Sequence, residues 1–265
     1  ADERRHHGAV REPQPQSNPR DVRPRPVAGQ RRSENVRRNT RGVRWVRFVR
    51  EDIVMKVLAH RGYWNVKIER NSPLAIRTAL ERGYGFESDL RDYRGKLVIS
   101  HNIAQGDSQS ADEVFRWLAE FGDRFCFAIN IKADGLREEL KHKLMEYQIE
   151  NYFTFDMSVP QMIEFSEFGL RFYTRQSEVE PKPILYDKAD GIWIDGFWST
   201  EWITESLLHE HLRNKKNVCI VSPDLHGRTQ GAFWETLLKY DIDFSRITLC
   251  TDRPDEAAKF FASKL

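Results

Sequence analysis

Two carboxylates, Glu87 and Asp89, are candidates for chemistry because they lie two residues apart in a short, mostly apolar run. Residues at that spacing project from the same face of a β-strand, so both side chains point together. Adjacent carboxylates repel each other, and the usual remedies near neutral pH are a shared proton, a cationic partner or a bound divalent cation. All-oxygen ligands suit Mg²⁺ or Ca²⁺. The alternative is a pair of exposed carboxylates on an edge strand.

A second group of candidates follows the apolar run that ends at Ala59. His60 has an imidazole that titrates near neutral pH, Arg61 is suited to bidentate phosphate binding, and Gly62 lets the loop turn close to a ligand. His101 follows another such run after the second strand. Taken singly, each histidine has the alternative interpretation of a hydrogen-bonded structural residue.

Polar residues recur at the ends of the remaining strand-like runs. A strand buried on both faces is almost wholly apolar, so polar residues at its carboxyl end indicate a site. The residues in question are Asn130, Lys132, Asp156, Arg175, Asp195, Asp224, His226 and Asp252.

The scaffold that brings strand ends together is predicted by the alternation of strand-like and helical stretches from Ile53 onward, which is typical of repeated βα units. The predicted strands are Ile53–Ala59, Tyr84–Leu90, Phe125–Ile131, Tyr152–Phe155, Leu170–Thr174, Gly191–Ile194, Val218–Val221 and Ile247–Cys250. The predicted helices are Pro73–Arg82, Ala111–Phe121, Asp134–Tyr147, Val159–Phe168, Thr204–Arg213, Gly231–Lys239 and Asp255–Ala262. We therefore predict an α/β protein, a (β/α)8 TIM barrel over residues 53–265, since that fold needs about 250 residues or somewhat fewer.

Two irregularities are expected in this pattern. Pro181 and Pro183 break any long helix in the fifth unit, so a loop or a shortened helix is predicted there. Tyr93 to Ser100 forms a short insertion after the second strand, with a turn at Arg94-Gly95.

The first 50 residues differ in composition from the rest of the chain. They hold 14 Arg and 5 acidic residues, about +9, whereas residues 51–265 hold 28 basic and 35 acidic residues, about −7. Such a segment buries too little apolar surface to order itself, so residues 1–52 are predicted to be a disordered tail. Binding of nucleic acid by this tail is the weaker interpretation. Met55 is the first Met and begins a strand-like run, so our hypothesis is that residues 1–54 are a non-native or misassigned leader.

Cysteine content and hydropathy favour a cytoplasmic protein. Three cysteines, Cys126, Cys219 and Cys250, are too few for a disulfide framework and are expected to be buried free thiols. No apolar run approaches the roughly 18 to 20 residues needed to span a bilayer. No hydrophobic insertion loop is evident in positions 55–265, so a membrane partner is not expected.

The candidates in sequence order resemble the motifs of the glycerophosphodiester phosphodiesterase family, in the phospholipase C-like superfamily of TIM barrels. The residues that carry the resemblance are Ala59-His60-Arg61-Gly62, Glu69, Asn71-Ser72, Ala75, Ala79, Gly83, Glu87, Asp89 and His101. The resemblance is close over residues 57–102. It continues weakly through Ala128 to Lys132 and through Thr251-Asp252-Arg253-Pro254.

The resemblance implies a role for each principal candidate. His60 and His101 would be the general acid and base, which suits attack on a phosphodiester because imidazoles work near neutral pH in both roles. Glu87 and Asp89 would hold the divalent cation, Mg²⁺ or Ca²⁺, that neutralises developing charge. The expected phosphate contacts are Arg61 and Lys132.

Two positions depart from the family pattern. Asn130 stands where the family usually has a metal-binding Glu, and an amide supplies one neutral oxygen in place of a carboxylate. An Asn carbonyl is still a legitimate ligand for a hard cation, so Asn130 is kept as a predicted metal ligand. Asn102 replaces an Asp after the second His, with an expected effect on the orientation of His101.

Asp195 and Trp193 complete the predicted site as substrate-binding residues. Asp195 is interpreted as a further ligand or a substrate hydroxyl acceptor, or else as the partner of a basic residue. Trp193, with Phe197 and Trp198, is interpreted as a wall against a glycerol or sugar moiety, or else as core.

The function predicted from these residues is metal-dependent hydrolysis of a small glycerophosphodiester in lipid metabolism, with a small-molecule phosphodiester as the partner. Two alternatives remain open. One is a lyase or transferase on the same fold that stops at a cyclic phosphate. The other is a barrel that lost its cation with the change at Asn130 and only binds phosphorylated ligands.

Overall fold

The computed structural model describes residues 55–264 of the 265-residue chain. The predicted tail over residues 1–52, the domain boundary at residue 53 and the leader hypothesis all concern the chain outside the described residues. These three remain predictions.

The described residues form an α/β fold with a ten-stranded mixed sheet. Its strands are β1 (Lys56–His60), β2 (Gly85–Tyr93), β3 (Lys96–Ile99), β4 (Gln109–Ser110), β5 (Phe127–Ile131), β6 (Tyr152–Phe155), β7 (Tyr173–Ser177), β8 (Gly191–Asp195), β9 (Asn217–Val221) and β10 (Ile247–Thr251). Parallel pairing runs from β1 through β2 and β5 to β6, and from β7 through β8, β9 and β10 back to β1. A single parallel bridge from Thr154 to Phe172 links β6 to the residue before β7. This strand order is consistent with a (β/α)8 barrel.

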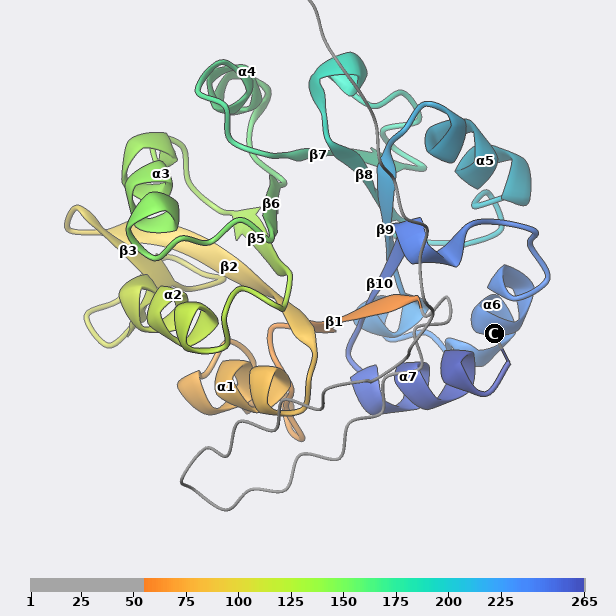
Figure 1. The fold of residues 1–265 in the computed structure, drawn as a ribbon, viewed down its shortest axis with the longest axis horizontal. Helices are drawn as coiled ribbons and strands as arrows, with labels where there is room; N and C mark the ends of the chain where they lie inside the picture. The colour runs from red at the N-terminus through yellow and green to blue at the C-terminus, as the bar shows by residue number, and fades with distance from the viewer. Residues whose placement is uncertain (1–54, 265) are drawn as a thin grey trace, which may run out of the picture. The chain divides into compact units, whose positions relative to one another are not determined.

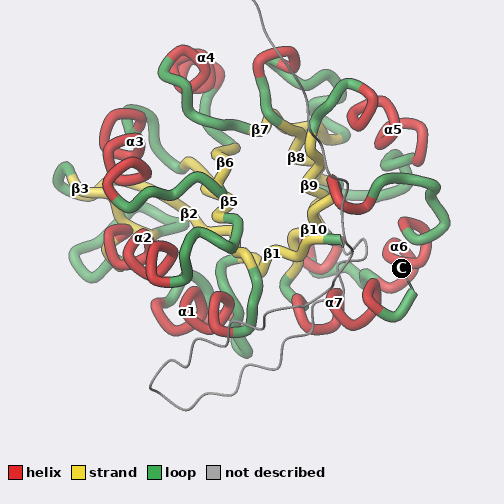
Figure 2. The backbone as a smooth tube through the Cα atoms, viewed as in Figure 1, coloured by secondary structure: helices red, strands yellow, loops and turns green. Residues whose placement is uncertain are grey.

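Among the described residues, seven α-helices alternate with the strands. They lie outside the parallel strands, as Figures 1 and 2 show. They are α1 (Pro73–Glu81), α2 (Ala111–Glu120), α3 (Arg137–Glu146), α4 (Val159–Glu167), α5 (Glu205–Arg213), α6 (Gly231–Leu237) and α7 (Pro254–Ala262). The predicted caps are present where Ser72 Oγ accepts from Ala75 N and Ser110 Oγ accepts from Asp112 N. Between β7 and β8 there is only the 3-10 turn Tyr186–Lys188, which confirms the loop expected around Pro181 and Pro183.

The insertion after the second strand is a hairpin. β2 continues three residues past its predicted end, and β3 pairs antiparallel with it, Leu90 opposite Ile99 and Tyr93 opposite Lys96. The turn at Arg94 and Gly95 has positive φ at both residues, as expected of a tight hairpin turn.

The predicted fifth strand, Leu170–Thr174, was placed too early, because β7 begins at Tyr173 and runs to Ser177. Gly169 ends α4 with a φ of 72°, and Leu170 N donates to Phe165 O, so Leu170 is the hydrophobic residue that closes the helix end. Leu170 is therefore buried because it packs at the end of the helix, not because it lies in a strand. As a consequence Arg175 lies inside β7, not after it.

The core divides into two large clusters between helices and sheet and a third cluster on the inner face of the strands. The third cluster gathers side chains from six strands, namely Leu58, Ala128, Phe153, Phe155, Trp193, Cys219, Val221 and Cys250. Contacts among residues so far apart in strand order require a strongly curved sheet. Cys219 and Cys250 are buried free thiols as predicted, and Cys126 is a partly buried one.

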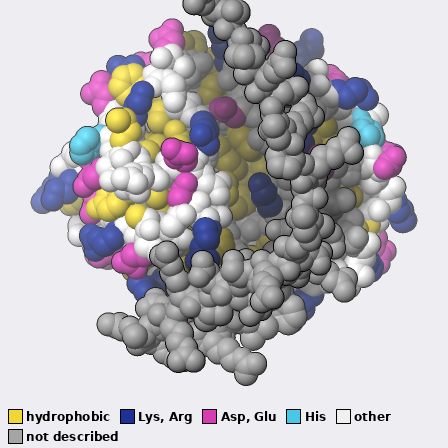
Figure 3. Space-filling model, in the orientation of Figure 1, with side chains coloured by type: hydrophobic (Ala, Val, Ile, Leu, Met, Phe, Trp, Pro, Cys, Tyr) yellow, Lys and Arg dark blue, Asp and Glu magenta, His cyan; other side chains and the backbone are white. Residues whose placement is uncertain are grey.

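Positive and negative side chains are interspersed over the face drawn in Figure 3, with hydrophobic side chains between them. Within residues 55–264, no helix combines the length and the hydropathy needed to cross a bilayer.

Candidate active site

His60 is the last residue of β1, and two carboxylates flank its ring. Its Nδ1 lies 2.6 Å from Asp252 Oδ1, and its Nε2 lies 3.8 Å from Glu87 Oε2. The side chain is 11% exposed, and burial lowers its pKa from the usual value near 6.5, although the contact with Asp252 opposes that change. With Nδ1 engaged by Asp252, Nε2 is the nitrogen left for a reacting group.

Asp252 is fixed in turn by several groups. It follows β10, the strand that pairs with β1, and its second carboxylate oxygen accepts from Arg70 Nη2. Asp224, in the loop after β9, accepts from the Asp252 backbone N at 2.7 Å and from the Thr251 hydroxyl at 2.8 Å. These contacts hold the carboxylate so that it orients the His60 ring.

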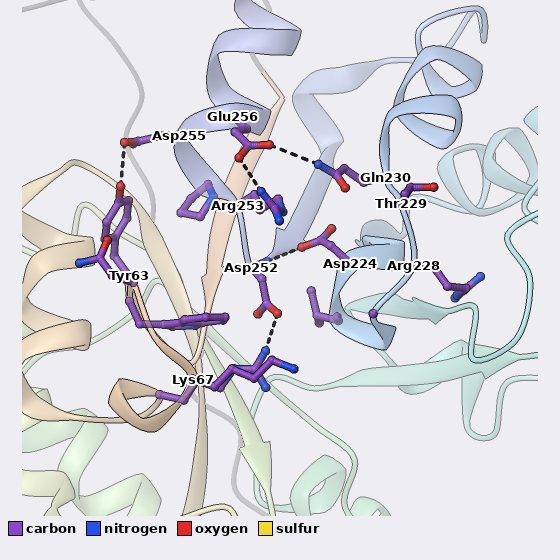
Figure 4. Close-up of a pocket in the computed structure, with 16 residues that line it drawn as sticks. Tyr63, Lys67, Asp224, Arg228, Thr229, Gln230, Asp252, Arg253, Asp255 and Glu256 are labelled. Carbon is purple, nitrogen blue, oxygen red and sulfur yellow. Dashed lines mark hydrogen bonds and ion pairs between the residues drawn. The ribbon is translucent and has the colours of Figure 1, made fainter.

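A cavity of about 680 Å³ opens beside this carboxylate, and we call it the strand-end cavity. The loops after β1, β9 and β10 line it. Figure 4 shows Asp224 and Asp252 on adjacent loops with the hydrogen bond between them drawn. Tyr63 and Asp255 lie at its edge, joined by a hydrogen bond of 2.9 Å.

Glu87 and Asp89 lie on β2 and are both almost fully buried, at 1% and 0% exposure. Register places Glu87 beside His60 on β1 and Asp89 beside Asn130 on β5. The structure therefore brings together four side chains that the sequence singled out. The edge-strand alternative is wrong, because β2 pairs with strands on both sides.

Asp89 is surrounded by donors. Its Oδ2 accepts from Asn71 Nδ2 at 2.7 Å and lies 3.2 Å from Arg61 Nε, and its Oδ1 lies 3.3 Å from Lys132 Nζ. Arg61 and Lys132, the two predicted phosphate contacts, thus both interact with the Asp89 carboxylate. Glu87 has one such contact, from Arg61 N at 3.1 Å, and burial together with the Asp89 charge raises the pKa of Glu87 to about 8.

The predicted metal ligands fit a hard cation by donor chemistry. All are oxygen donors, and Asn130 Oδ1 is buried without a hydrogen-bond partner while its Nδ2 donates to Asp156 Oδ2 at 3.2 Å. A cation beside Glu87 would give Asn130 Oδ1 a partner. It would also offset the repulsion between the Glu87 and Asp89 carboxylates. Within the described residues, no group of three or more His, Cys, Asp or Glu is arranged to hold a metal, and Asn130 would add an amide oxygen to the two carboxylates.

Replacing Asn130 by Glu should strengthen binding of Mg²⁺ or Ca²⁺ by about tenfold or more, because it adds a formal charge to the ligand set. Isothermal titration calorimetry with each cation measures the change. Asn102→Asp is the matched control, since it adds the same charge on an exposed loop, and it should leave cation affinity unchanged. Equal affinity of Asn130→Glu and the unaltered protein would show that residue 130 is not a ligand.

The raised pKa of Glu87 predicts how stability depends on pH when chelator is present. Between about 4.5 and about 8 the folded state keeps a proton that the unfolded state releases, so the free energy of unfolding falls as pH rises through this window. At about 1.4 kcal/mol per pKa unit, the fall attributable to Glu87 is a few kcal/mol. Urea unfolding across this pH range should show a shallower slope for Glu87→Gln. An unchanged slope would mean that Glu87 titrates near its ordinary pKa.

His101 lies in the exposed loop after β3. Its Nδ1 is 3.0 Å from Asn102 Oδ1, so the Asn that replaces the family Asp still contacts the ring. His101 also lines a second cavity of about 400 Å³ together with Arg61 and Arg70. The structure therefore places His101 beside the predicted phosphate contact but not in contact with Glu87 or Asp89.

The two remaining predicted residues occupy different environments. Asp195 ends β8, and its Oδ1 lies 2.6 Å from His226 Nε2, so it is the partner of a basic residue. Trp193 is 4% exposed and stacks on Phe155 with ring centroids 3.8 Å apart, which makes it an interior residue and not a wall of the cavity. Of the aromatic trio, Trp198 is the exposed member, at 71%.

Arg70 is the main residue that the sequence did not single out. It contacts Asp252 and lies over the Trp64 ring at 4.4 Å, and it lines both cavities. Its position directly before Asn71-Ser72 was the one available signal. The pairing of His60 with Asp252 across 192 positions could not be read from the sequence.

No family model matches the sequence, and no curated protein matches it. Solved structures do match. A glycerophosphodiester phosphodiesterase from Parabacteroides distasonis has a TM-score of 0.61 at 15% identity, covering 78% of this chain and 97% of its own. The chain has the fold of these phosphodiesterases.

Two further solved structures support the same fold. A glycerophosphodiester phosphodiesterase from Agrobacterium tumefaciens has a TM-score of 0.56 at 16% identity, covering 78% of this chain and all of its own. A phosphodiesterase from Oleispira antarctica, in complex with the product sn-glycerol-3-phosphate, has a TM-score of 0.57 at 12% identity and covers 78% and 96%. The resemblance seen in the motifs is thus matched by a resemblance in fold.

Proposed function

We propose that this chain is a metal-assisted phosphodiesterase that hydrolyses a small glycerophosphodiester at the group formed by His60, Glu87 and Asp89, beside the strand-end cavity that Asp252 lines. The observation that carries the proposal is His60, held by Asp252 on one nitrogen and facing Glu87 with the other, beside Arg61 and Lys132. A fold shared with glycerophosphodiester phosphodiesterases supports it. The product bound to the Oleispira antarctica enzyme suggests glycerol phosphate as one product.

His60 acts as the general base in this proposal. Because burial lowers its pKa, the imidazole is neutral near pH 7 and accepts a proton on Nε2 from the attacking water, whose oxygen forms the new bond to phosphorus as the bond to the leaving alcohol breaks. Asp252 stabilises the resulting imidazolium through Nδ1. His101, exposed on its loop, protonates the leaving alkoxide when substrate lies between the two rings.

Arg61 and Lys132 bind the phosphoryl oxygens. The side chains of Arg61 and Lys132 both pair with the Asp89 carboxylate, which holds them in place. A phosphate that enters the site would therefore meet two positively charged groups that are already oriented. A cation held by Glu87, Asp89 and Asn130 would supply further neutralisation of phosphoryl charge. Asp195 is proposed to accept a hydrogen bond from a substrate hydroxyl, while its Oδ1 contacts His226 Nε2.

We further propose that the parallel strands close into a (β/α)8 barrel over residues 53–265. The Thr154–Phe172 bridge and the inner-face cluster support closure. Residues 1–52 remain a proposed tail, and the cytoplasm a proposed location.

A second candidate function is a phosphate-binding barrel that has lost catalysis. It is favoured by one observation, that Arg61 and Lys132 already neutralise Asp89 while Asn130 replaces a carboxylate. Such a protein would bind glycerol phosphate without turnover. A lyase that stops at a cyclic phosphate is distinguished by its product.

Turnover of a panel of glycerophosphodiesters, with Mg²⁺ or Ca²⁺ and with chelator, tests the proposal. We expect glycerol phosphate to appear with a cation and to be suppressed by chelator. Calorimetric binding of glycerol phosphate with no turnover of any panel member would support the binding barrel instead. A cyclic product that accumulates would support the lyase.

A further inference from the structure

The second cavity beside the candidate active site is lined by an amide without a hydrogen-bond partner. We call this cavity of about 400 Å³ the insertion groove, because the insertion after β2 supplies part of its lining. Within the insertion, His101 follows β3, and Gln109 lies in β4 opposite Ile99. Gln109 Nε2 and Oε1 are both buried, and neither has a partner among residues 55–264. Buried polar groups that lack partners cost free energy, so an unmet donor and acceptor at this wall point to a ligand.

Most other polar side chains of the insertion groove have partners within the protein. The hydrogen-bonded ones are Asn71 with Asp89 and Ser88, Ser72 with Ala75 N, Ser100 with Asn102 O, and Asn102 with His101. Arg61 pairs with Asp89, and Arg70 pairs with Asp252. Gln109 therefore has the amide of this groove that is left to bind a ligand.

The Gln109 side chain can present both amide atoms to a ligand without breaking a contact. Its backbone is held in place, because β4 pairs with β3 and the next residue, Ser110, caps α2. The terminal torsion of a glutamine side chain is broad, so the amide can turn toward the groove. No side-chain hydrogen bond to another described residue is lost when it turns. A ligand that carries a donor and an acceptor side by side would satisfy the amide.

The proposed mechanism determines which half of the substrate reaches this groove. His60 activates the attacking water, and His101, which lines the insertion groove, protonates the leaving oxygen. Because the attacking and leaving oxygens lie roughly in line on opposite sides of phosphorus, the departing alcohol lies on the His101 side. Its bond to phosphorus breaks, and its oxygen takes the His101 proton. The insertion groove therefore receives the leaving alcohol.

We propose that the insertion groove selects a leaving alcohol with vicinal hydroxyl groups, such as glycerol, through the Gln109 amide. One hydroxyl donates to Gln109 Oε1, and its neighbour accepts from Nε2, so both amide atoms gain a partner. A site built to bind a hydroxyl by hydrogen bonds discriminates against an analogue that lacks it, because buried polar groups are then left unpaired. This inference rests on the proposed function, since it requires His101 to act on the leaving oxygen.

A cationic leaving alcohol is the alternative, and Asp107 is the residue that would favour it. Asp107 lines the insertion groove and is exposed. Ion pairs at exposed positions contribute little because water screens them, whereas the Gln109 amide is buried. The imidazolium that His101 carries as the acid would also repel a cationic alcohol. The structure therefore favours a neutral polyol.

Steady-state kinetics with glycerophosphoglycerol, glycerophosphocholine and glycerophosphoethanolamine tests the proposal on the full chain. We expect kcat/KM to be highest for glycerophosphoglycerol, whose leaving alcohol is a vicinal diol. Gln109→Leu should lower that value by about tenfold or more and leave the other two substrates unchanged. Its Tm should not fall, because the amide that it removes has no partner in the ligand-free protein.

Gln105→Leu is the matched control. Gln105 is exposed in the same insertion and does not line the insertion groove, so this variant should match the unaltered protein with all three substrates. Equal losses with the three substrates in Gln109→Leu, or a higher kcat/KM for either cationic headgroup in the unaltered protein, would overturn the proposal.

Calorimetry with His60→Gln and Mg²⁺ separates this inference from the proposed function, because that variant is expected to bind without turnover. We expect glycerophosphoglycerol to bind about tenfold more tightly than glycerophosphocholine, and the difference to vanish when Gln109→Leu is added. This selectivity without turnover of any substrate by the unaltered protein would contradict the phosphodiesterase and keep the role of Gln109. Equal affinities for the two diesters would overturn the inference.

Discussion

Replacing His60 by Gln should lower kcat/KM for glycerophosphodiester hydrolysis by about 1000-fold, because general acid–base catalysis contributes about 100- to 10000-fold. Gln retains a polar group at the buried strand end but cannot take up the proton of the attacking water. The effect should fall on kcat, with KM changed little, since Arg61 and Lys132 still bind the phosphate. Steady-state kinetics at saturating cation measures both parameters.

His226→Gln is the matched control for this experiment. His226 lies in the loop after β9 and also has a carboxylate oxygen 2.6 Å away, on Asp195. It contacts neither Glu87 nor Asp252 among the interactions of the described residues, so its loss should cost far less activity. Equal losses in the two variants would remove the case for His60 as the base.

Replacing Asp252 by Asn should lower kcat by about 100-fold, because the carboxylate that orients and stabilises the His60 ring is lost. The pH profile separates this role from a structural one. Asp252 raises the pKa of His60 against the effect of burial, so the variant base has a lower pKa. The acid limb of the kcat/KM profile should therefore move to lower pH while the plateau falls.

Asp255→Asn controls for disturbance of the same loop. Asp255 accepts from the Tyr63 and Tyr84 hydroxyls and pairs with Arg82, and it does not contact His60. This variant should lose stability, visible as a lower Tm, with the acid limb in its original place. An acid limb that stayed in place in Asp252→Asn would show that Asp252 does not act on His60.

Elements with strong local signals could be predicted from the sequence. Ser72 before Pro73 defined the start of α1, and the two prolines after β7 correctly excluded a long helix there. Glu87 and Asp89 were predicted to share one face of a strand because they are two residues apart. Both do lie on one strand, β2, whose neighbours are β1 and β5. These features depend on residues only a few positions apart.

Features that depend on distant residues could not be predicted. Asp252 and His60 are 192 positions apart, and only the pairing of β1 with β10 brings them into contact. Trp193 was ambiguous because alternate residues of a strand face opposite sides, and the register that turns it inward onto Phe155 is a tertiary property. Leu170 was misread because a helix-closing residue and a strand residue are both buried and apolar.

Phosphorus NMR of a single reaction tests the central claim most directly. A glycerophosphodiester is incubated with the unaltered protein and Mg²⁺ or Ca²⁺, and in parallel with His60→Gln. We predict that the diester resonance is replaced by that of a glycerol phosphate monoester in the first sample and persists in the second. A diester that persists with the unaltered protein under both cations, or that disappears equally fast with His60→Gln, would contradict a phosphodiesterase centred on His60.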